Sequence, residues 1–234
     1  PESVDMIFAD PPYFLSNGGI TCKGGKMVSV NKGSWDKLSE SGTSVEEKHK
    51  FNRKWIKLCK KVLKPNGTIW ISGTLHNIYS IGMALEQEGF KIINNIIWQK
   101  TNPPPNLACR CFTHSTETIL WARKNDKKSR HFFNYQKMKE MNGGKQMKDV
   151  WTGSLTKPSE KLEGKHPTQK PEYLLERIIL ASTEKGQVIL DPFCGSGTTG
   201  VEAVKYGRKF IGIDVSEEYM EISKKRLEKL LNDK

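Results

Sequence analysis

The chain has 234 residues and a formal net charge of +12, from 38 Lys and Arg against 26 Asp and Glu. This length suffices for one substantial α/β core, and the excess positive charge favours a polyanionic partner such as a nucleic acid. Five scattered cysteines and the lack of a membrane-length apolar run predict a reduced, cytoplasmic protein without a disulfide framework. Cys109 and Cys111 have no second ligand pair at zinc-finger spacing, so we expect no metal site.

Strand and helix patterns alternate along the chain. In order, they predict strand 6–9, helix 46–63, strand 68–72, helix 78–88, strand 91–99, strand 116–122, helix 172–183, strand 188–190, helix 198–204, strand 209–213 and a C-terminal helix that includes 224–229. Residues 63–67, Leu-Lys-Pro-Asn-Gly, are typical of a helix end followed by a turn. Such alternation predicts a mostly parallel sheet with helices on both faces, in a single α/β domain.

Three irregular segments interrupt this scaffold. Residues 16–44 contain two Gly-Gly pairs, which are typical either of a lid over a bound base or of a simple surface loop. Residues 101–110 include three consecutive prolines, which stiffen the connection. Residues 125–165 are basic and turn-rich, with interleaved aromatic side chains. That composition suits contact with nucleic-acid backbone and bases, although packing is an alternative role for the aromatic side chains.

The first candidate site is Asp10-Pro11-Pro12-Tyr13, at the end of predicted strand 6–9. Its two prolines have a fixed φ and no N–H, so the segment is stiff and rich in acceptors. The Asp10 carboxylate and the Pro11 carbonyl can converge on one NH₂ group, while Tyr13 offers an aromatic face. The pattern predicts a site for the exocyclic amine of a planar base. A proline-stiffened turn with a structural Asp and a core Tyr is the alternative.

The second candidate site follows strand 188–190 and reads Asp-Pro-Phe-Cys-Gly-Ser-Gly over 191–197. A glycine-rich turn between a strand and a helix suits a nucleoside cofactor, and this one lacks the lysine of a P-loop. Asp214 ends the next predicted strand, about 20 residues later, where an acidic residue meets a ribose in nucleotide-binding units. Since parallel strands end at one edge of a sheet, we expect the two sites to bring two substrates together for a group transfer.

Together, the two motifs resemble those of the amino-group DNA methyltransferases that use S-adenosylmethionine. The catalytic motif precedes the cofactor loop, an order similar to the β class and most similar to adenine-N6 enzymes of GATC restriction-modification systems. The resemblance implies a Rossmann-like class I methyltransferase fold in one permuted domain. Its parts would be a catalytic part (1–100), a target-recognition region (about 101–165) and a cofactor-binding part (166–234). It also implies an upstream strand that the given sequence does not include.

The same resemblance supplies a set of expected site residues. The implied catalytic residues are Asp10, Pro11, Pro12 and Tyr13. The implied cofactor-binding residues are Asp191, Phe193, Gly195, Ser196, Gly197, Thr198 and Asp214, joined by His166, Thr168 and Lys170 of a His-Pro-Thr-Gln-Lys-Pro motif. Lys170 lies beside a predicted helix start, where a bound carboxylate, such as that of the cofactor's methionine end, would account for it. A solvated His and Lys is the alternative.

The implied reaction transfers a methyl group from S-adenosylmethionine to N6 of a flipped or single-stranded adenine, with GATC as the expected target. Single- or double-stranded DNA is the expected partner, and a homodimer is compatible with the pattern. Alternatives with the same chemistry use cytosine N4, an RNA adenine or a protein glutamine amide as the acceptor. A non-catalytic nucleic-acid-binding protein is the alternative of a different class, and the intact motif at 10–13 argues against it.

Overall fold

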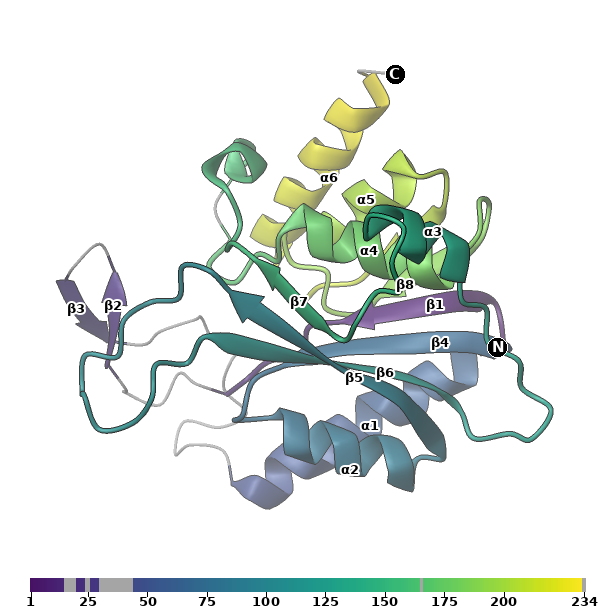
Figure 1. Ribbon diagram of the computed structural model, residues 1–234, viewed down its shortest axis with the longest axis horizontal. Coiled ribbons are helices and arrows are strands. Elements are labelled where there is room, and N and C mark those ends of the chain that lie inside the picture. The colour runs from purple at the N-terminus through teal and green to yellow at the C-terminus, as the bar shows by residue number, and fades with distance from the viewer. Residues whose placement is uncertain (15–19, 24–25, 30–43, 165, 233–234) are drawn as a thin grey trace.

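The computed structural model describes residues 1–14, 20–23, 26–29, 44–164 and 166–232 (Figure 1). Within 20–29, only the backbone of a short hairpin is described, formed by β2 (Ile20–Lys23) and β3 (Lys26–Ser29). Apart from this hairpin backbone and Ser44, the predicted lid over 16–44 lies outside the described residues. In the described part of the chain, no helix combines the length and the apolar character needed to cross a membrane.

The centre of the molecule is a seven-stranded sheet in the order β7-β5-β6-β4-β1-β8-β9. Its strands are β1 (Val4–Ala9), β4 (Leu63–Gly73), β5 (Phe90–Lys100), β6 (Thr116–Lys124), β7 (Val150–Gly153), β8 (Val188–Asp191) and β9 (Lys209–Gly212). β6 runs antiparallel to both β4 and β5, and every other neighbouring pair in this sheet is parallel. The prediction of a mostly parallel sheet is confirmed.

Helices cover both faces of the sheet (Figure 1). The helices α1 (Val45–Val62) and α2 (Ile78–Gln87) lie on one face. On the other side lie α3 (Tyr135–Met141), α4 (Glu172–Ser182), α5 (Thr198–Lys205) and α6 (Glu217–Asn232). A sheet covered on both faces needs apolar residues at successive positions of its central strands, and β1 has them. Ile7 and Ala9 enter the core under α1 and α2, whereas Met6 and Phe8 enter the core under α4.

One predicted turn is absorbed into a strand. We expected residues 63–67 to form a helix end and a turn, but β4 already begins at Leu63. Its pairing with β1 jumps from Val4–Leu63 to Met6–Thr68, so the turn becomes an irregularity in the strand. Gly67 permits this close approach, because a Cβ there would lie 2.8 Å from the carbonyl oxygen of Asp5.

The range 101–165, expected to form the target-recognition region, is divided by the scaffold. Strand β6 lies within it and pairs on both sides in the sheet, and β7 extends the sheet beside β5. These strands appear in the sheet because they bury aromatic side chains, among them Trp121 and Trp151. The sequence pattern had not predicted α3, β7 or the short 3₁₀ helix Pro158–Lys161.

The antiparallel course of β6 decides which parts of this range reach the carboxyl-terminal edge of the parallel strands. Residues 101–115 connect β5 to β6 at that edge, and residues from 154 onward return to it after β7. Asn102 accepts a hydrogen bond from the N–H of Leu155 at 2.9 Å, which ties these two connections together. Residues 125–149 lie at the opposite edge, where Asn134 donates its N–H to the carbonyl of Ala181.

Candidate active site

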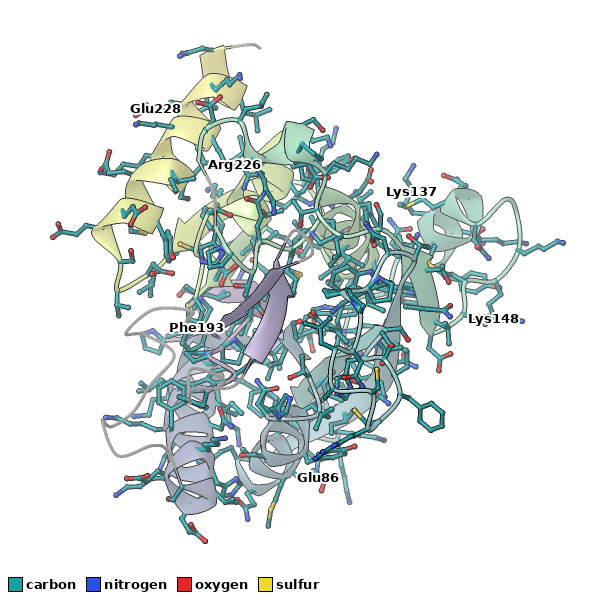
Figure 2. All side chains as sticks on the ribbon, turned by 90° about the vertical axis from the view of Figure 1, so that its left-hand side faces the viewer. Glu86, Lys137, Lys148, Phe193, Arg226 and Glu228 are labelled. Carbon is teal, nitrogen blue, oxygen red and sulfur yellow. The ribbon has the colours of Figure 1, made fainter. Side chains whose placement is uncertain are left out.

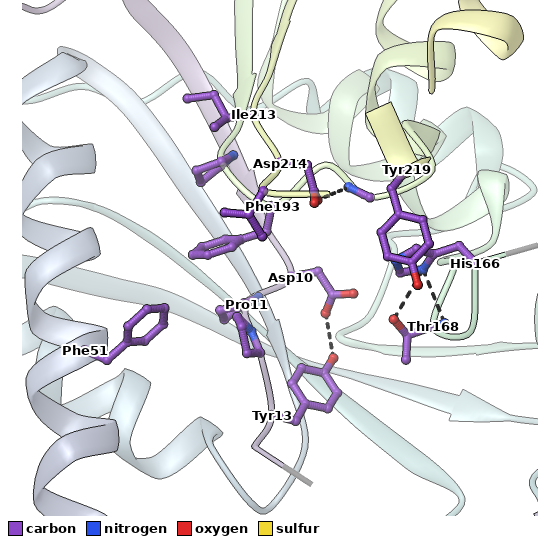
Figure 3. Close-up of a pocket in the computed structure, with 14 residues that line it drawn as sticks. Asp10, Pro11, Tyr13, Phe51, His166, Thr168, Phe193, Ile213, Asp214 and Tyr219 are labelled. Carbon is purple, nitrogen blue, oxygen red and sulfur yellow. Dashed lines mark hydrogen bonds between the residues drawn. The ribbon is translucent and has the colours of Figure 1, made fainter. Parts of the chain in front are cut away.

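The two predicted motifs meet at the carboxyl-terminal edge of the sheet. Asp10 follows β1 directly, Asp191 ends β8, and these strands are parallel neighbours paired through Met6–Ile189 and Ile7–Leu190. A cavity of about 320 Å³ opens beside them (Figure 3). It is lined by Asp10, Pro11, Pro12, Tyr13, Phe51, His166, Thr168, Pro192, Phe193, Gly195, Ile213, Asp214, Val215 and Tyr219. A cavity of this size with a few convergent polar groups is typical of a small-molecule site.

Both oxygens of the Asp10 carboxylate are held by neighbouring side chains. The hydroxyl of Tyr13 donates to Oδ1 at 2.6 Å, and the ammonium of Lys170 donates to Oδ2 at 2.5 Å (Figure 3 shows the first bond). Burial, reinforced by the nearby carboxylates, raises the pKa of Tyr13 well above its ordinary value, so its hydroxyl remains a donor. Because each carboxylate oxygen can accept a further hydrogen bond, Asp10 is oriented yet still able to bind an amine.

Glu117 of β6 lies beside Lys170 and Tyr13, the two partners of Asp10, and the sequence analysis did not identify it. Its carboxylate pairs with Lys100 at 2.7 Å and with Lys170 at 3.5 Å, and it also accepts a hydrogen bond from Tyr13 at 3.5 Å. Burial acts to raise the pKa of Glu117, but the two ammonium groups outweigh burial and hold this pKa below its ordinary value. Only the antiparallel placement of β6 beside β4 brings Glu117 to the site, so no local motif could have indicated it.

The ammonium of Lys170 contacts three side chains of the site, namely Asp10, Glu117 and Tyr13. Lys170 also lines a small cavity beside the glycine-rich loop, so its expected role in holding a cofactor carboxylate stays a prediction. Burial acts to lower the pKa of Lys170, yet the carboxylates of Asp10 and Glu117 dominate and raise this pKa, so the group stays charged. Lys170 therefore belongs to the catalytic motif's surroundings at least as much as to the cofactor loop.

The glycine-rich loop after β8 is held in a conformation that other residues adopt poorly. Gly197 has a φ of 76°, and a Cβ there would lie 2.1 Å from the hydroxyl oxygen of Ser223 on α6. Gly195 has a φ of 48°, and a Cβ there would lie 3.0 Å from Nε2 of His166. The guanidinium of Arg226 donates to the carbonyl of Ser196 at 2.8 Å, which fastens the loop to α6. The loop is thus shaped before any ligand binds.

Asp191 stabilises this loop from beneath. Its carboxylate accepts the hydroxyl of Thr199 at 2.6 Å and the N–H of Phe193 at 3.0 Å, and its side chain is buried. Burial raises the pKa of Asp191 to about 7. Asp191 does not line the larger cavity. Together with Ser196 and Thr198 it borders an adjoining cavity of about 30 Å³.

Asp214 lines the larger cavity together with Asp10 (Figure 3). Its carboxylate accepts the N–H of Gly195 at 2.8 Å and the N–H of Ser216 at 2.9 Å. A carboxylate has about four acceptor positions, so two of them remain for ligand hydroxyls. This geometry suits a ribose between Asp214 and the loop.

His166 and Thr168 also line the larger cavity. The ring of His166 packs edge-on against Tyr219 at a centroid distance of 4.3 Å, and its Nδ1 accepts the N–H of Thr168 at 3.3 Å. Burial lowers the pKa of His166 to about 4, so the imidazole is neutral at physiological pH. An uncharged aromatic wall of this kind tolerates a cationic ligand nearby.

Apolar walls complete the cavity, and most of them were not expected. Phe51 comes from α1, while Ile213 and Val215 flank Asp214 and are 53% and 87% exposed. The exposure of two apolar side chains around an acidic strand end is a signal that a ligand covers them, but it becomes visible only in the structure. In the described part of the chain, no three His, Cys, Asp or Glu side chains are placed to hold a metal ion.

Comparisons with known proteins agree with this geometry. A family model described as DNA methylase, N6_N4_Mtase, matches residues 4–225. The chain is 76% identical over 228 residues to the type II methyltransferase M2.DpnII of Streptococcus pneumoniae, covering 97% of this chain and 84% of that protein. It is also 76% identical over 229 residues to M2.LlaDCHI of Lactococcus lactis subsp. cremoris, covering 98% and 84%. The crystal structure of an M1.HpyAVI–SAM complex matches with a TM-score of 0.70 and 31% identity, covering 97% and 89%.

Proposed function

Because the chain belongs to the N6_N4 family of DNA methylases, which depend on S-adenosylmethionine, we propose that it methylates adenine N6. We propose GATC as its target sequence and a restriction-modification system as its setting. The observation that carries the proposal is the Asp10 carboxylate, which borders the cavity with both oxygens oriented by Tyr13 and Lys170. The names of the relatives support a type II system. The choice of GATC rests on the resemblance of the first site to enzymes of GATC systems. A DNA substrate also supports the expected cytoplasmic location.

The cofactor supplies an electrophilic methyl group on a sulfonium. The amino nitrogen of adenine is a weak nucleophile, because its lone pair is delocalised into the ring. Asp10 and the carbonyl of Pro11 would accept its two hydrogens, favour a tetrahedral nitrogen and aim the lone pair at the methyl carbon. The nitrogen forms the new bond as the carbon–sulfur bond breaks, and it then loses one proton. Orientation and electrostatics supply the acceleration, and no covalent enzyme intermediate is needed.

The larger cavity is the proposed cofactor site. Its volume and mostly apolar walls suit a nucleoside, and Asp214 offers free acceptor positions for the ribose hydroxyls. Phe193 and Tyr219 supply aromatic walls near the loop. The smaller cavity beside Ser196 and Thr198 is the proposed place of the methionine end.

Binding measurements test the assignment of Asp214. We expect Asp214→Ala to weaken S-adenosylmethionine binding by roughly tenfold or more, because hydrogen bonds to a charged acceptor are strong. Isothermal titration calorimetry measures this effect. Asp214→Asn, which retains one acceptor for the Gly195 N–H, separates ribose binding from loop support. An affinity in both variants equal to that of the parent would remove Asp214 from the cofactor site.

Two connections are the proposed DNA contacts: 101–115 and 154–164. Both lie at the carboxyl-terminal edge, and Arg110 and Lys157 within them are exposed. Residues 125–149 were expected to take part, but they lie at the opposite edge. We therefore restrict the proposed target-recognition region to the two connections that reach the site.

Acceptors other than adenine remain as candidates with the same chemistry, since the family covers both N6 and N4 transfer. The experiment that decides uses methyl-labelled cofactor and matched oligonucleotides, double- and single-stranded, with GATC, GTTC or no site. After digestion to nucleosides, we expect label in N6-methyl-2′-deoxyadenosine from GATC substrates only. Label in N4-methylcytosine, or equal label without GATC, would contradict the proposal. Parallel incubations with RNA and with protein test the other two acceptors, and no transfer in any of these reactions would leave the non-catalytic alternative.

A further inference from the structure

Four charged side chains form an alternating chain beneath the candidate active site. Asp10 pairs with Lys170 at 2.5 Å, Lys170 with Glu117 at 3.5 Å, and Glu117 with Lys100 at 2.7 Å. All four are largely covered, with side-chain exposures between 7% and 16%. Two carboxylates and two ammonium groups give this chain of ion pairs a net charge of zero.

Covered charges interact strongly with one another and with a nearby ligand, because little water screens them. Lys170 lies directly against Asp10, so alone it would cancel the negative charge that Asp10 offers to the cavity. Glu117 also faces this ammonium, at 3.5 Å. Lys100 in turn balances Glu117 and lies beside the ring of Trp98. Tyr13 and His166, which also border the site, are neutral, whereas the carboxyl groups of Asp191 and Asp214 lie farther along the cavity walls and are the same in every variant compared below.

The reaction of the proposed function depends on the sign of the net charge that these four side chains present to the cavity. The sulfonium is cationic before transfer. During transfer the nitrogen lone pair forms the N–C bond, the C–S electron pair stays on sulfur, and the positive charge passes to nitrogen until one proton leaves for water. A positive charge therefore lies near Asp10 throughout, and an unbalanced Lys170 would oppose it.

We propose that Glu117 is a positioning residue that offsets the charge of Lys170, so that Asp10 faces the cationic cofactor and the cationic transition state as an effective anion. The inference rests on the proposed function only in requiring a sulfonium cofactor in the cavity, and it does not depend on which base is methylated. Glu117 acts through Lys170 and Asp10 and need not contact either substrate.

Two ligands of nearly equal shape and different charge test this role. S-adenosylmethionine carries the sulfonium, whereas S-adenosylhomocysteine is a neutral thioether at the same position. Glu117→Gln leaves the chain of ion pairs with one excess positive charge. We expect it to weaken binding of the methyl donor relative to the thioether by about fivefold or more, the scale of one partly screened charge. Calorimetry on the full chain gives both affinities.

Two further variants should reverse and cancel the shift in the affinity ratio of the two ligands. Lys100→Met leaves one excess negative charge and should shift the affinity ratio of the two ligands in the opposite direction. The double variant Glu117→Gln with Lys100→Met restores net zero and should return the ratio to the parental value. Glu88→Gln is the matched control, because Glu88 is a largely covered glutamate paired with Arg53 that does not line either cavity of the site.

A merely structural role for Glu117 would weaken both ligands equally and leave their ratio unchanged, and that outcome would overturn the proposal. A ratio that stays altered in the double variant would overturn it too, since the effect would not follow charge. If Glu117→Gln does not fold, Lys100→Met alone still tests the proposal. The direction in which this variant shifts the affinity ratio of the two ligands then decides. The readout is ligand binding, so failure to methylate adenine would contradict the proposed function and leave this inference standing.

Discussion

At the residue scale, the two carboxylate oxygens of Asp10 are each held by a different donor. Oδ1 is held by Tyr13 and Oδ2 by Lys170, so the carboxylate cannot rotate away from the cavity. From the sequence, Tyr13 was expected to act through its ring, as a stacking surface. The structure adds a second role, because the Tyr13 hydroxyl is the donor that fixes Oδ1.

We expect Asp10→Ala to lower single-turnover methyl transfer by roughly a hundredfold or more, as when one oriented transition-state partner is removed. Cofactor affinity should change far less. Tyr13→Phe keeps the ring but frees Oδ1, and should lower transfer by about tenfold with DNA affinity retained. Tyr13→Ala should lower both the rate of methyl transfer and the DNA affinity. A parental rate in Asp10→Ala would contradict the mechanism, and a parental rate in Tyr13→Phe would show that the hydroxyl contributes nothing.

Asp191 gives a prediction about pH. Burial raises its pKa to about 7 from an ordinary value of 3.8. Between about pH 4 and 7 the folded protein holds a proton that the unfolded chain releases, so the contribution of Asp191 to stability falls as pH rises through this window. Asp191→Asn removes the titration. The free energy of unfolding of the variant, relative to the parent, should therefore rise by about 2 kcal/mol or more from pH 4 to 7.

Urea denaturation at several pH values measures this difference. Comparing variant with parent cancels the opposite contribution of His166, whose lowered pKa makes the fold lose stability as pH falls from about 6.5 towards 4. The exposed Asp149→Asn is the matched control. A difference between Asp191→Asn and the parent that stays constant with pH would mean that Asp191 is ionised in the folded protein.

At the element scale, the loop between β8 and α5 depends on α6. Gly197 has a positive φ and lies against Ser223, so a side chain there meets both backbone strain and a clash. Arg226 adds hydrogen bonds from α6 to the carbonyl of Ser196 and the hydroxyl of Thr198. The cofactor loop and the last helix therefore form one packed unit.

We expect Gly197→Ala to lower the free energy of unfolding by about 2 kcal/mol or more and to weaken cofactor binding, because the loop must move away from Ser223. Gly143→Ala is the matched control. Gly143 also has a positive φ, of 63°, but a Cβ there meets nothing within 4 Å, so it should cost only about 1 kcal/mol of strain. Denaturation curves compare the two. Equal costs would show that packing against α6 is unimportant.

At the scale of the whole molecule, the sheet separates basic residues by edge. Lys137 and Lys148 project from one side of the molecule, away from Phe193 at the site (Figure 2). Met138, between them in the sequence, packs on Leu180 and Ala181 at the last turn of α4. Arg110, Lys157 and Lys161 belong instead to the connections at the site's edge.

DNA binding at increasing salt tests this separation. Replacing Arg110, Lys157 and Lys161 by Gln should flatten the plot of log affinity against log salt by up to about 2.7, since each lost phosphate contact lowers the slope by about 0.9. Replacing Lys137, Lys139, Lys145 and Lys148 by Gln is the control and should leave the slope close to parental. The reverse result would place DNA on the opposite edge of the sheet.

The sequence by itself determined the strands and helices with strong periodicity, the mostly parallel sheet, and both motifs. Asp10, Tyr13 and Asp214 stand at strand ends, where local sequence and the rule for parallel sheets suffice to predict a site.

Tertiary structure alone decided which residues surround them. Glu117 comes beside Lys170 and Lys100 because β6 runs antiparallel between β4 and β5, and Lys170 reaches Asp10 across 160 residues of chain. The same strand direction sends residues 125–149 to the far edge, although their composition resembles a DNA-binding segment. Composition and periodicity are local properties, whereas strand order and direction depend on how apolar faces far apart in the chain bury one another.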